Sequence, residues 1–584
     1  MPITVSRGFV TGLLWPLRTA PWLAAGLLCA CTTTLPPPPA TAPPPPSQPS
    51  VPVPQPAMQV AAEAPALPYS EAVAARFPDP VVNFSTPAFA DGRSAFTSNA
   101  ELQALLRSLA RDAVEPGGLA VRLLALGSSQ KGVPLEALLF SREADTSVAG
   151  LLTAATSFTR PTVLLVGQQH GDEPAGAEAL LVAAQELAQG SLRPLLDRIN
   201  VLVLPRANPD GAAANQRASA GGVDVNRDHL LLRTPEAQAQ ATLMRDFRPL
   251  VVIDAHEYTV VGRFLEKFDA VQRYDALVQH ATVANLPPFI GRAADEWFRA
   301  PLQDSLTRAG LTSQWYYTTS TDLADKKVSM GGVQPDTGRN VNGLKNAISL
   351  LVETRGVGIG RAHLARRVQT QLVALRSVLN NAAERAADLV KLRQYVDRDI
   401  AAQACRGEVI VEAAATPSEY ALQMIDPQTG DDKTVTVAWD SALTLRTVKA
   451  RPRPCGYWLD AEQADAVRRL RLLGVQVQQV AARGSVRSEA YRETLREDAV
   501  RKDVRGSIAD AGGMLRLQVE LQPQPLELRI GGYYIGLDQP LANLVVAALE
   551  PDTQNSYAAN RIVTTTDGVV RVLARPAVKM VRLP

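Results

Sequence analysis

Two of the five histidines in this 584-residue chain stand at the ends of apolar runs. His170 follows the run VLLVG in the stretch VLLVGQQHGDEPAG, which also holds Glu173, and His256 ends the run LVVIDAH. A catalytic zinc ion takes three protein ligands, for which His and Glu are suited, and keeps one position open. We therefore predict that these three side chains bind one Zn²⁺. A His and a Glu three residues apart more often lie in a solvated loop, so the prediction depends on His256.

A polar stretch, PRANPDGAAANQRASAGGVDVNRD, separates the two histidines. Its NPDG sequence is typical of a turn. An arginine next to an amide side chain, as in the Asn226–Arg227 pair, suits bidentate binding of a carboxylate. Taken alone, such residues would more often form a solvated loop. The remaining histidines, His229, His280 and His363, are interpreted as surface or structural residues.

The elements that must position these residues alternate between strands and helices. Apolar runs predict strands at 161–167, 199–205, 249–255 and 347–353. Helical patterns occur at 173–190, 235–247 and 361–397, and an earlier helix at 99–113, with Asn99 as a possible N-cap, precedes strands at 119–127 and 135–141. This alternation predicts an α/β fold with a mixed, mostly parallel sheet flanked by helices. The strand ends that carry His170, His256 and Glu353 then lie along one edge of that sheet.

Together these motifs resemble the zinc metallocarboxypeptidases of the carboxypeptidase A type, including secreted bacterial lipoproteins of that kind. The resemblance covers roughly residues 160 to 360. The segments that carry it are HGDE at 170–173, NPDG at 208–211, Arg217, GVDVNRD at 222–228, DAHE at 254–257 and LLVETRG at 350–356.

The resemblance implies catalytic roles for three further residues. Glu353 is the general base, Arg217 polarises the scissile carbonyl, and Asp224 accepts a hydrogen bond from His170. A carboxylate beside a zinc-activated water can take its proton and later deliver it to the leaving amine. The alternative for Glu353 is a strand-end carboxylate paired with Arg355.

The resemblance also implies how the substrate is bound. Asn226 and Arg227 hold the terminal carboxylate of the peptide. Counting back without gaps from Glu353 places Arg339 at the position that sets side-chain preference, where an arginine favours an acidic terminal residue; the alternative is a surface arginine. A mobile tyrosine of the digestive enzymes has no clear counterpart, and Tyr316 and Tyr317 are candidates that also fit a strand or the core.

The N-terminus is typical of a targeting segment. Two arginines precede a short apolar stretch from Ala20 to Ala30, and LCAC at 28–31 resembles a bacterial lipoprotein cleavage site. We expect residues 1–30 to be a signal peptide and Cys31 to be lipidated, with ordinary secretion as the alternative. Residues 31–69, rich in proline, form a tether.

Two folded domains are expected after the tether: a catalytic domain at 70–398 and a β-rich α+β accessory domain at 399–584. The second contains short alternating runs and resembles the trailing domain of secreted bacterial carboxypeptidase-like proteins. Cys405 and Cys455 are the cysteines left in the mature chain, and in an oxidising compartment they form a possible disulfide; two unpaired thiols are the alternative.

The formal net charge of +2 and the lack of a long basic stretch argue against nucleic acid as a partner. We expect a lipid-anchored zinc carboxypeptidase in the bacterial cell envelope, on the periplasmic face of the outer membrane, that acts on a peptide or muropeptide. Alternatives are an N-acyl-amino-acid deacylase or murein-peptide amidase of the same fold, or a lipoprotein that binds without catalysis.

Overall fold

The computed structural model describes residues 67–112, 119–142, 160–510 and 512–584. The predicted signal peptide, Cys31 and nearly all of the tether lie outside these residues. Among the described residues, no helix combines the length and apolar character that crossing a membrane requires.

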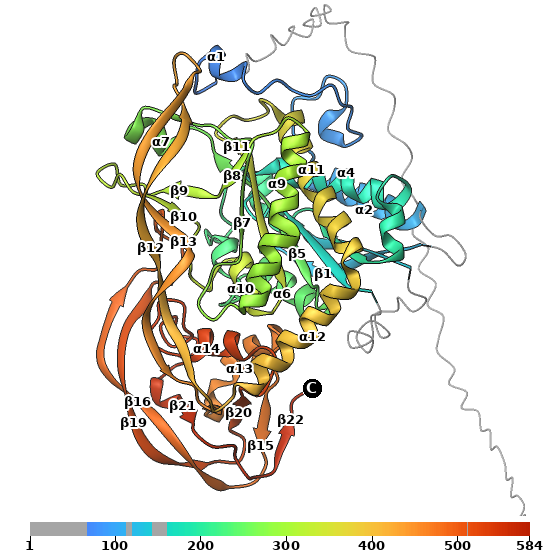
Figure 1. Ribbon diagram of the computed structural model, residues 1–584. Helices are drawn as coiled ribbons and strands as arrows, with labels where there is room; N and C mark the ends of the chain where they lie inside the picture. Colours follow the sequence, from blue (N-terminus) through green and yellow to red (C-terminus); the bar gives the residue numbers. More distant parts are fainter. Residues whose placement is uncertain (1–66, 113–118, 143–159, 511) are drawn as a thin grey trace, which may run out of the picture. The chain divides into compact units, whose positions relative to one another are not determined.

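An eight-stranded sheet forms the centre of the first part of the chain, in the order β1-β2-β4-β3-β5-β11-β7-β8 (Figure 1). Its strands are β1 Ala120–Ser128, β2 Pro134–Ser141, β3 Thr162–Gly167, β4 Asn200–Leu204, β5 Val251–Thr259, β7 Ala276–His280, β8 Ser313–Trp315 and β11 Ile348–Val357. The inner strands β4, β3, β5 and β11 run parallel, while β1, β2 and β7 each pair antiparallel with a neighbour. The mixed, mostly parallel sheet predicted from the alternating pattern is confirmed.

Alternate side chains of the inner strands pack into two separate hydrophobic layers. Val163 and Leu165 of β3 face the layer that includes helices α4 (Pro174–Gln189) and α11 (Leu364–Glu384). Leu164 and Val166 face the layer built on helix α6 (Pro235–Phe247). Both faces of the inner strands are therefore buried, which explains why their sequences are continuously apolar.

Two helix boundaries differ from the predictions. Asn99 is the first residue of α2 (Asn99–Asp112) and not its cap. Ser98 caps this helix instead: its hydroxyl accepts from Glu101 N at 3.3 Å, while the Glu101 carboxylate accepts from Ser98 N at 2.8 Å. The stretch predicted as one helix at 361–397 is two, because α11 ends before Arg385 and α12 (Ala386–Ala402) follows it.

The last third of the chain is built from long antiparallel ribbons. One ribbon pairs β12 (Glu408–Ile425) with β13 (Asp432–Pro452). It joins strands β6 (Val271–Gln272), β9 (Tyr317–Thr319) and β10 (Val328–Met330) in a five-stranded sheet. That sheet combines strands from both sides of residue 398, so the two predicted domains share a structural element. The described residues between 67 and 584 form one compact unit.

A seven-stranded sheet follows, in the order β19-β16-β21-β14-β20-β15-β22. Its strands are β14 Gly456–Leu459, β15 Gln478–Val480, β16 Gly484–Ala499, β19 Met514–Leu528, β20 Tyr533–Gly536, β21 Val569–Val572 and β22 Met580–Arg582. Helices α13 (Ala464–Leu472) and α14 (Ala542–Leu549) accompany it, and a disulfide joins Cys405 to Cys455 with an S–S distance of 2.00 Å. The β-rich character expected of this region is confirmed.

Short elements connect these layers. They are α1 Glu71–Ala74, α5 Pro209–Ala214, α7 Gly262–Phe268, α8 Pro288–Ala293, α9 Ala300–Arg308, α10 Gly338–Leu344, the π-helix Ala294–Arg299, the small hairpin β17 Lys502–Asp503 with β18 Gly506–Ser507, and 3₁₀ turns at Pro87–Phe89, Arg193–Asp197, Val225–Arg227, Ala461–Gln463 and Thr566–Gly568.

Candidate active site

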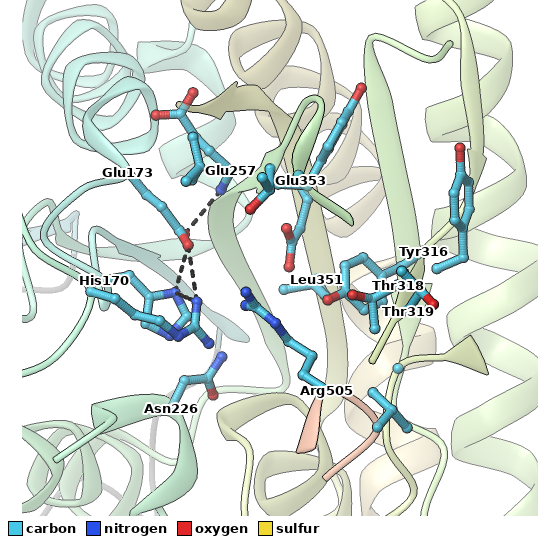
Figure 2. Close-up of a pocket in the computed structure, with 18 of the residues that line it drawn as sticks. His170, Glu173, Asn226, Glu257, Tyr316, Thr318, Thr319, Leu351, Glu353 and Arg505 are labelled. Atoms are coloured by element: carbon cyan, nitrogen blue, oxygen red, sulfur yellow. Dashed lines mark hydrogen bonds and ion pairs between the residues drawn. The ribbon is translucent and has the colours of Figure 1, made fainter. Parts of the chain in front are cut away.

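Three predicted zinc ligands, His170, Glu173 and His256, lie together and are buried. The Glu173 carboxylate joins the two rings: Oε1 is 2.7 Å from His170 Nδ1 and Oε2 is 2.8 Å from His256 Nδ1. The two Nδ1 atoms are 3.1 Å apart, and Figure 2 shows His170 and Glu173 of this set. Two imidazoles and one carboxylate, converging from three directions, match the donor set of a catalytic zinc site. The residues therefore fit one zinc ion.

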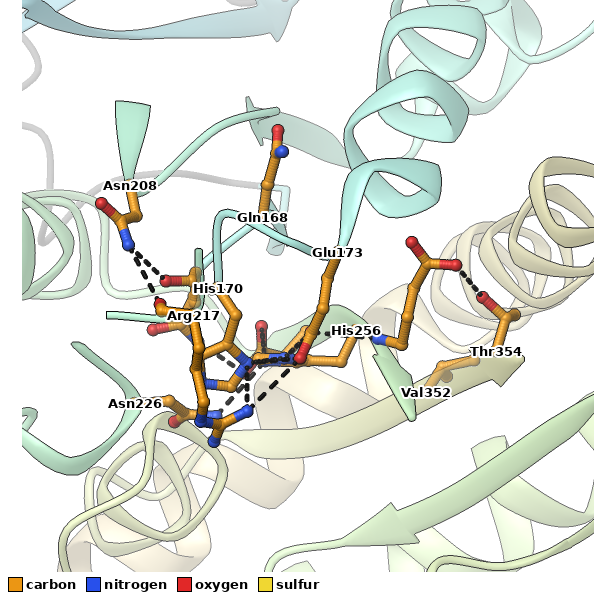
Figure 3. A network of polar contacts seen from close by, with 12 residues as sticks. Gln168, His170, Glu173, Asn208, Arg217, Asn226, His256, Val352 and Thr354 are labelled. Carbon is orange, nitrogen blue, oxygen red and sulfur yellow. Dashed lines mark hydrogen bonds and ion pairs between the residues drawn. The ribbon is translucent and has the colours of Figure 1, made fainter. Parts of the chain in front are cut away.

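Glycine makes the first ligand loop possible. A Cβ on Gly171 would lie only 1.9 Å from the backbone carbon of Gly211. The NPDG sequence, predicted as a turn, is instead the N-terminus of helix α5, and Gly211 lies in its first turn. The two loops are joined by a hydrogen bond from Gly171 N to Gln216 O at 3.0 Å. Asn208 caps the helix α5 that follows it, accepting from Gly211 N at 3.0 Å, and its amide donates to Gln169 O at 3.2 Å (Figure 3). The two sequence motifs are thus halves of one packed unit.

The third ligand and the predicted base are neighbours across two parallel strands. In the β5–β11 register, Glu353 lies directly opposite His256. Val352 and Ala255, the residues beside them in sequence, pack into the layer of α4 and α11, so Glu353 and His256 project from the other face. Adjacent strands and equal register therefore bring the carboxylate to the zinc ligands.

Glu353 is buried, with 8% of its surface exposed, and lines a cavity of about 380 Å³ together with His170 and Glu173 (Figure 2). Burial, followed by the negative charge of Glu173, raises the pKa of Glu353 to about 7. Its carboxylate has no hydrogen-bond or ion-pair partner within the part of the chain that the structure describes. Arg355, the alternative partner, instead donates to Gln272 O and stacks 3.7 Å from the centre of the Phe77 ring.

Each zinc histidine contacts an aspartate carboxylate through its Nε2 atom. Asp224 Oδ1 lies 3.1 Å from His170 Nε2, as expected from the resemblance, and Asp254 Oδ1 lies 2.9 Å from His256 Nε2. Such carboxylates fix the ring tautomer and leave the other nitrogen free for the metal. Burial alone would raise the pKa of Asp224, but Arg217 and His170 outweigh it and hold that pKa well below its usual range.

Asp254 was missed by the sequence analysis, although a signal was present. Residues two apart on a strand point to the same face, so Asp254 and His256 must be neighbours. Gln169 donates to Asp254 Oδ2 at 2.6 Å, and His229 Nε2 lies 2.7 Å from Gln169 Oε1. His229 therefore has a structural role behind the site, while His280 packs edge-on against Trp315.

The three polar residues expected to face the substrate line the same cavity but already have partners. Arg217 pairs with Asp224 at 2.9 Å, and its Nη1 reaches His170 Nδ1 at 3.1 Å. The Asn226 side-chain oxygen Oδ1 accepts from Gly338 N at 2.8 Å. Arg227 pairs with Asp503, at 2.6 Å, a residue that no sequence signal connected with the site.

Arg339 also lines the cavity and is not a surface residue, with 3% of its area exposed. It donates to Gly332 O at 2.9 Å and to Asn340 Oδ1 at 3.3 Å. No carboxylate pairs with it among the described residues, and burial lowers its pKa to about 10.

Both tyrosine candidates line the cavity, and Tyr316 is half-buried. Tyr317 is a core residue: it is 1% exposed and its hydroxyl lies 3.8 Å from Met424 Sδ.

Comparison with known proteins agrees with this geometry. The family model described as zinc carboxypeptidase matches residues 112–271, which contain all three zinc ligands. This part of the chain is therefore similar to the zinc carboxypeptidase family. Carboxypeptidase 2 of Trichophyton rubrum is 27% identical over 421 residues, covering 70% of this chain and 74% of its own. The protein is a zinc metallocarboxypeptidase that hydrolyses C-terminal peptide bonds.

Two further relatives match shorter parts of this carboxypeptidase. Carboxypeptidase D of Mus musculus is 39% identical over 119 residues, covering 19% of this chain and 9% of its own. The crystallised metallo-carboxypeptidase from Pseudomonas aeruginosa is 20% identical, with a TM-score of 0.36, and the match covers 49% of this chain and 68% of that one.

Proposed function

We propose that this carboxypeptidase removes C-terminal residues from peptides of the bacterial cell envelope, with Glu353 as general base. The observation that carries the proposal is the placement of Glu353 opposite His256 in the strand register, on the face of the sheet that carries the zinc ligand. A bound zinc ion supplies Lewis acidity and lowers the pKa of a coordinated water towards about 7. The unpaired Glu353 carboxylate is then the group that accepts the water proton and returns it to the leaving amine.

The arginines of the cavity support the remaining roles. Arg217 lies beside the ligand set through its 3.1 Å contact with His170 Nδ1, where a guanidinium can stabilise developing oxyanion charge. Arg227 and Asn226 bind the terminal carboxylate of the peptide. The pair with Asp503 uses Arg227 Nε and one N–H of Nη2, and Nη1 donates one N–H to Asn226 O. One N–H on each of Nη1 and Nη2 is left for the substrate carboxylate.

Arg339 supports a preference for an acidic terminal residue. A guanidinium that is buried without a carboxylate partner bears a desolvation cost, which a substrate carboxylate in the cavity would offset. Placement in the envelope rests on the sequence of residues 1–56, where an apolar segment, the LCAC motif and a proline-rich stretch follow one another. Lipidation of Cys31 would anchor the enzyme to the outer membrane, on its periplasmic face.

The test compares zinc content and hydrolysis for the wild type and Glu353→Gln. The variant should retain zinc and lose activity by about 10²–10⁴-fold, because only the proton-accepting group is removed. Glu266→Gln makes the same chemical change at the exposed rim of the cavity and should keep the wild-type rate.

Hippuryl-type peptides, N-acyl amino acids and muropeptides serve as substrates in this assay. Hydrolysis of the hippuryl-type peptides supports the carboxypeptidase assignment. Cleavage of acylated amino acids or muropeptides alone would point to a deacylase or amidase of the same fold. Zinc binding without cleavage of any amide would mean a binding lipoprotein.

A further inference from the structure

A small hairpin from the C-terminal third of the chain reaches into the catalytic cavity. Strands β17 and β18 pair Lys502 with Ser507 and Asp503 with Gly506, which leaves Val504 and Arg505 as the two-residue tip. Both tip residues line the cavity that also contains Glu353 and two of the zinc ligands, His170 and Glu173. The positive φ of 126° at Gly506 is one that a side-chain-bearing residue rarely adopts, so the glycine permits this tight reversal.

The Asp503 carboxylate fixes this tip to the catalytic part of the chain. Its Oδ2 accepts from Arg227 Nη2 at 2.6 Å and from Arg227 Nε at 3.0 Å. Its Oδ1 accepts from the backbone N–H of Arg505 at 2.8 Å. On the other side, Thr321 N and Oγ1 donate to Arg505 O at 3.0 and 3.2 Å. The backbone of Arg505 is therefore held from two directions.

The base of the hairpin is equally well anchored. Arg501 is buried and donates to Arg227 O at 2.9 Å and to Asn555 Oδ1 at 3.0 Å. It also forms ion pairs with Asp336 at 3.3 Å and with Asp510 at 3.2 Å. The tip is thus presented by a rigid support, which is what a specificity-determining residue requires.

The Arg505 side chain, in contrast, has no carboxylate partner among the described residues. It is half-buried, and Figure 2 shows its guanidinium extending from the hairpin towards the zinc ligands and Glu353. The charge of Arg227 is already neutralised by its ion pair with Asp503. Arg505 and Arg339 are therefore the guanidinium groups of this cavity that have no carboxylate partner among the described residues.

We propose that Arg505 is a substrate-binding, specificity-determining residue that pairs with a carboxylate of the peptide, and that Asp503 is the residue that positions it. This inference depends on the proposed peptidase function for its kinetic test. The carboxylate comes either from the side chain of the terminal residue or from the side chain of the residue before the scissile bond. In both cases a guanidinium in a partly desolvated cavity offers bidentate, charge-assisted hydrogen bonds.

The kinetic experiment uses three peptides of equal length: one with an acidic terminal residue, one with an acidic penultimate side chain and one with neither. In Arg505→Gln, the ratio of kcat/KM for the acidic peptide over the neutral peptide should fall about tenfold, mainly through KM. The acidic peptide whose ratio falls identifies the source of the carboxylate. Asp503→Asn should lower the same ratio by a smaller factor, because Arg505 keeps its charge and loses its support.

Lys502→Gln is the matched control, since it removes one charge from the same hairpin at an exposed position outside the catalytic cavity. It should leave the ratio unchanged. An equal change for all three peptides in Arg505→Gln, no change in any of them, or the same change in Lys502→Gln would overturn the proposal.

A binding measurement separates this proposal from the peptidase function itself. Calorimetry compares zinc-loaded Glu353→Gln with Glu353→Gln/Arg505→Gln, using the acidic and the neutral peptide as ligands. The second protein should lose about tenfold in affinity for the acidic peptide alone. This loss would support Arg505 even if the wild type cuts no peptide. Equal affinities of the two proteins for the acidic peptide would refute it even if the wild type is an active peptidase.

Discussion

The two halves of the catalytic cavity are built in opposite ways. On the metal half, the two zinc histidines and Arg217 are paired inside the protein: His170 with Asp224, His256 with Asp254, and Arg217 with Asp224. The proposed base, Glu353, is left without a partner among the described residues. On the substrate half, Arg339 and Arg505 have no carboxylate partner in the described part of the chain.

This difference separates preorganisation from recognition. The paired groups of the metal half hold ligand atoms in fixed positions, so little reorganisation is needed when the reaction occurs. The unpaired arginines of the substrate half gain a partner only when a carboxylate enters. Variants of the first half should therefore change zinc affinity or kcat, whereas variants of the second half should change the choice of substrate.

After Glu353→Gln, the largest effect is expected from Arg217→Gln, which removes a donor beside the ligand set. Loss of one oxyanion-stabilising donor lowers kcat by about 10²–10³-fold. Steady-state kinetics on the neutral peptide measures it, with Arg263→Gln at the exposed cavity rim as control. If Arg217→Gln changed KM while kcat stayed the same, Arg217 would contribute to substrate binding and not to stabilising the oxyanion.

Asp254→Asn should weaken zinc binding by about 10–100-fold, because the carboxylate behind His256 orients the ring and raises its basicity. Zinc affinity is measured by competition with a chelator of known stability. Asp224→Asn provides the comparison on the other histidine, and Asp388→Asn, on the surface of α12, is the neutral control. Unchanged zinc affinity in Asp254→Asn would show that Asp254 does not support zinc binding by His256.

Arg339→Gln should lower the preference for an acidic over a neutral terminal residue by about tenfold, with little effect on zinc affinity. Arg339→Lys keeps a positive charge but loses the planar fork, so it should retain part of the preference. The measurement is kcat/KM for two peptides that differ in the terminal residue. A parallel loss for both peptides would indicate a general packing role.

The smallest effect concerns pH. Glu353 accepts a proton only as a carboxylate, so kcat/KM should rise with pH through its ionisation. Burial and the charge of Glu173 raise its pKa to about 7, and the positive charge of zinc should move the midpoint of the rise below that value. A profile that falls with pH across this range would contradict the assignment of the base.

The same shift predicts the stability of EDTA-treated protein. Because the pKa of Glu353 is higher in the folded protein than the ordinary value of 4.5, the folded state binds the proton more tightly than the unfolded state. Stability is therefore greatest below about pH 4.5 for this group and falls as pH rises towards about 7. Thermal unfolding should show that this fall is weaker in Glu353→Gln.

Much of the metal half could be predicted from the sequence because its residues lie within short, regular elements. The strand pattern placed His170, His256 and Glu353 at strand ends, and the fixed two-residue period of a strand then decided which side chains share a face. Asp254 followed from the same rule but was missed. The cap of α2 was misassigned because Ser98 and Asn99 are both good capping residues, and only the Glu101 contact distinguishes them.

The substrate half could not be predicted in the same way. Arg339 was reached only by counting back from Glu353, and its burial beside Gly332 came from the structure. Asp503 and Arg505 lie in a polar stretch with no motif. Their part in the site depends on a ribbon fold that returns the chain to the cavity.

The sequence by itself determined the zinc ligands and the alternating α/β framework, since local periodicity and short spacings decide which atoms can meet. The role of Glu353 as base came from the family resemblance and stays a prediction. Only the tertiary structure decided which arginine charges are cancelled and which remain for a ligand. That outcome depends on contacts between segments far apart in the chain, such as Arg227 with Asp503, and no local pattern encodes them.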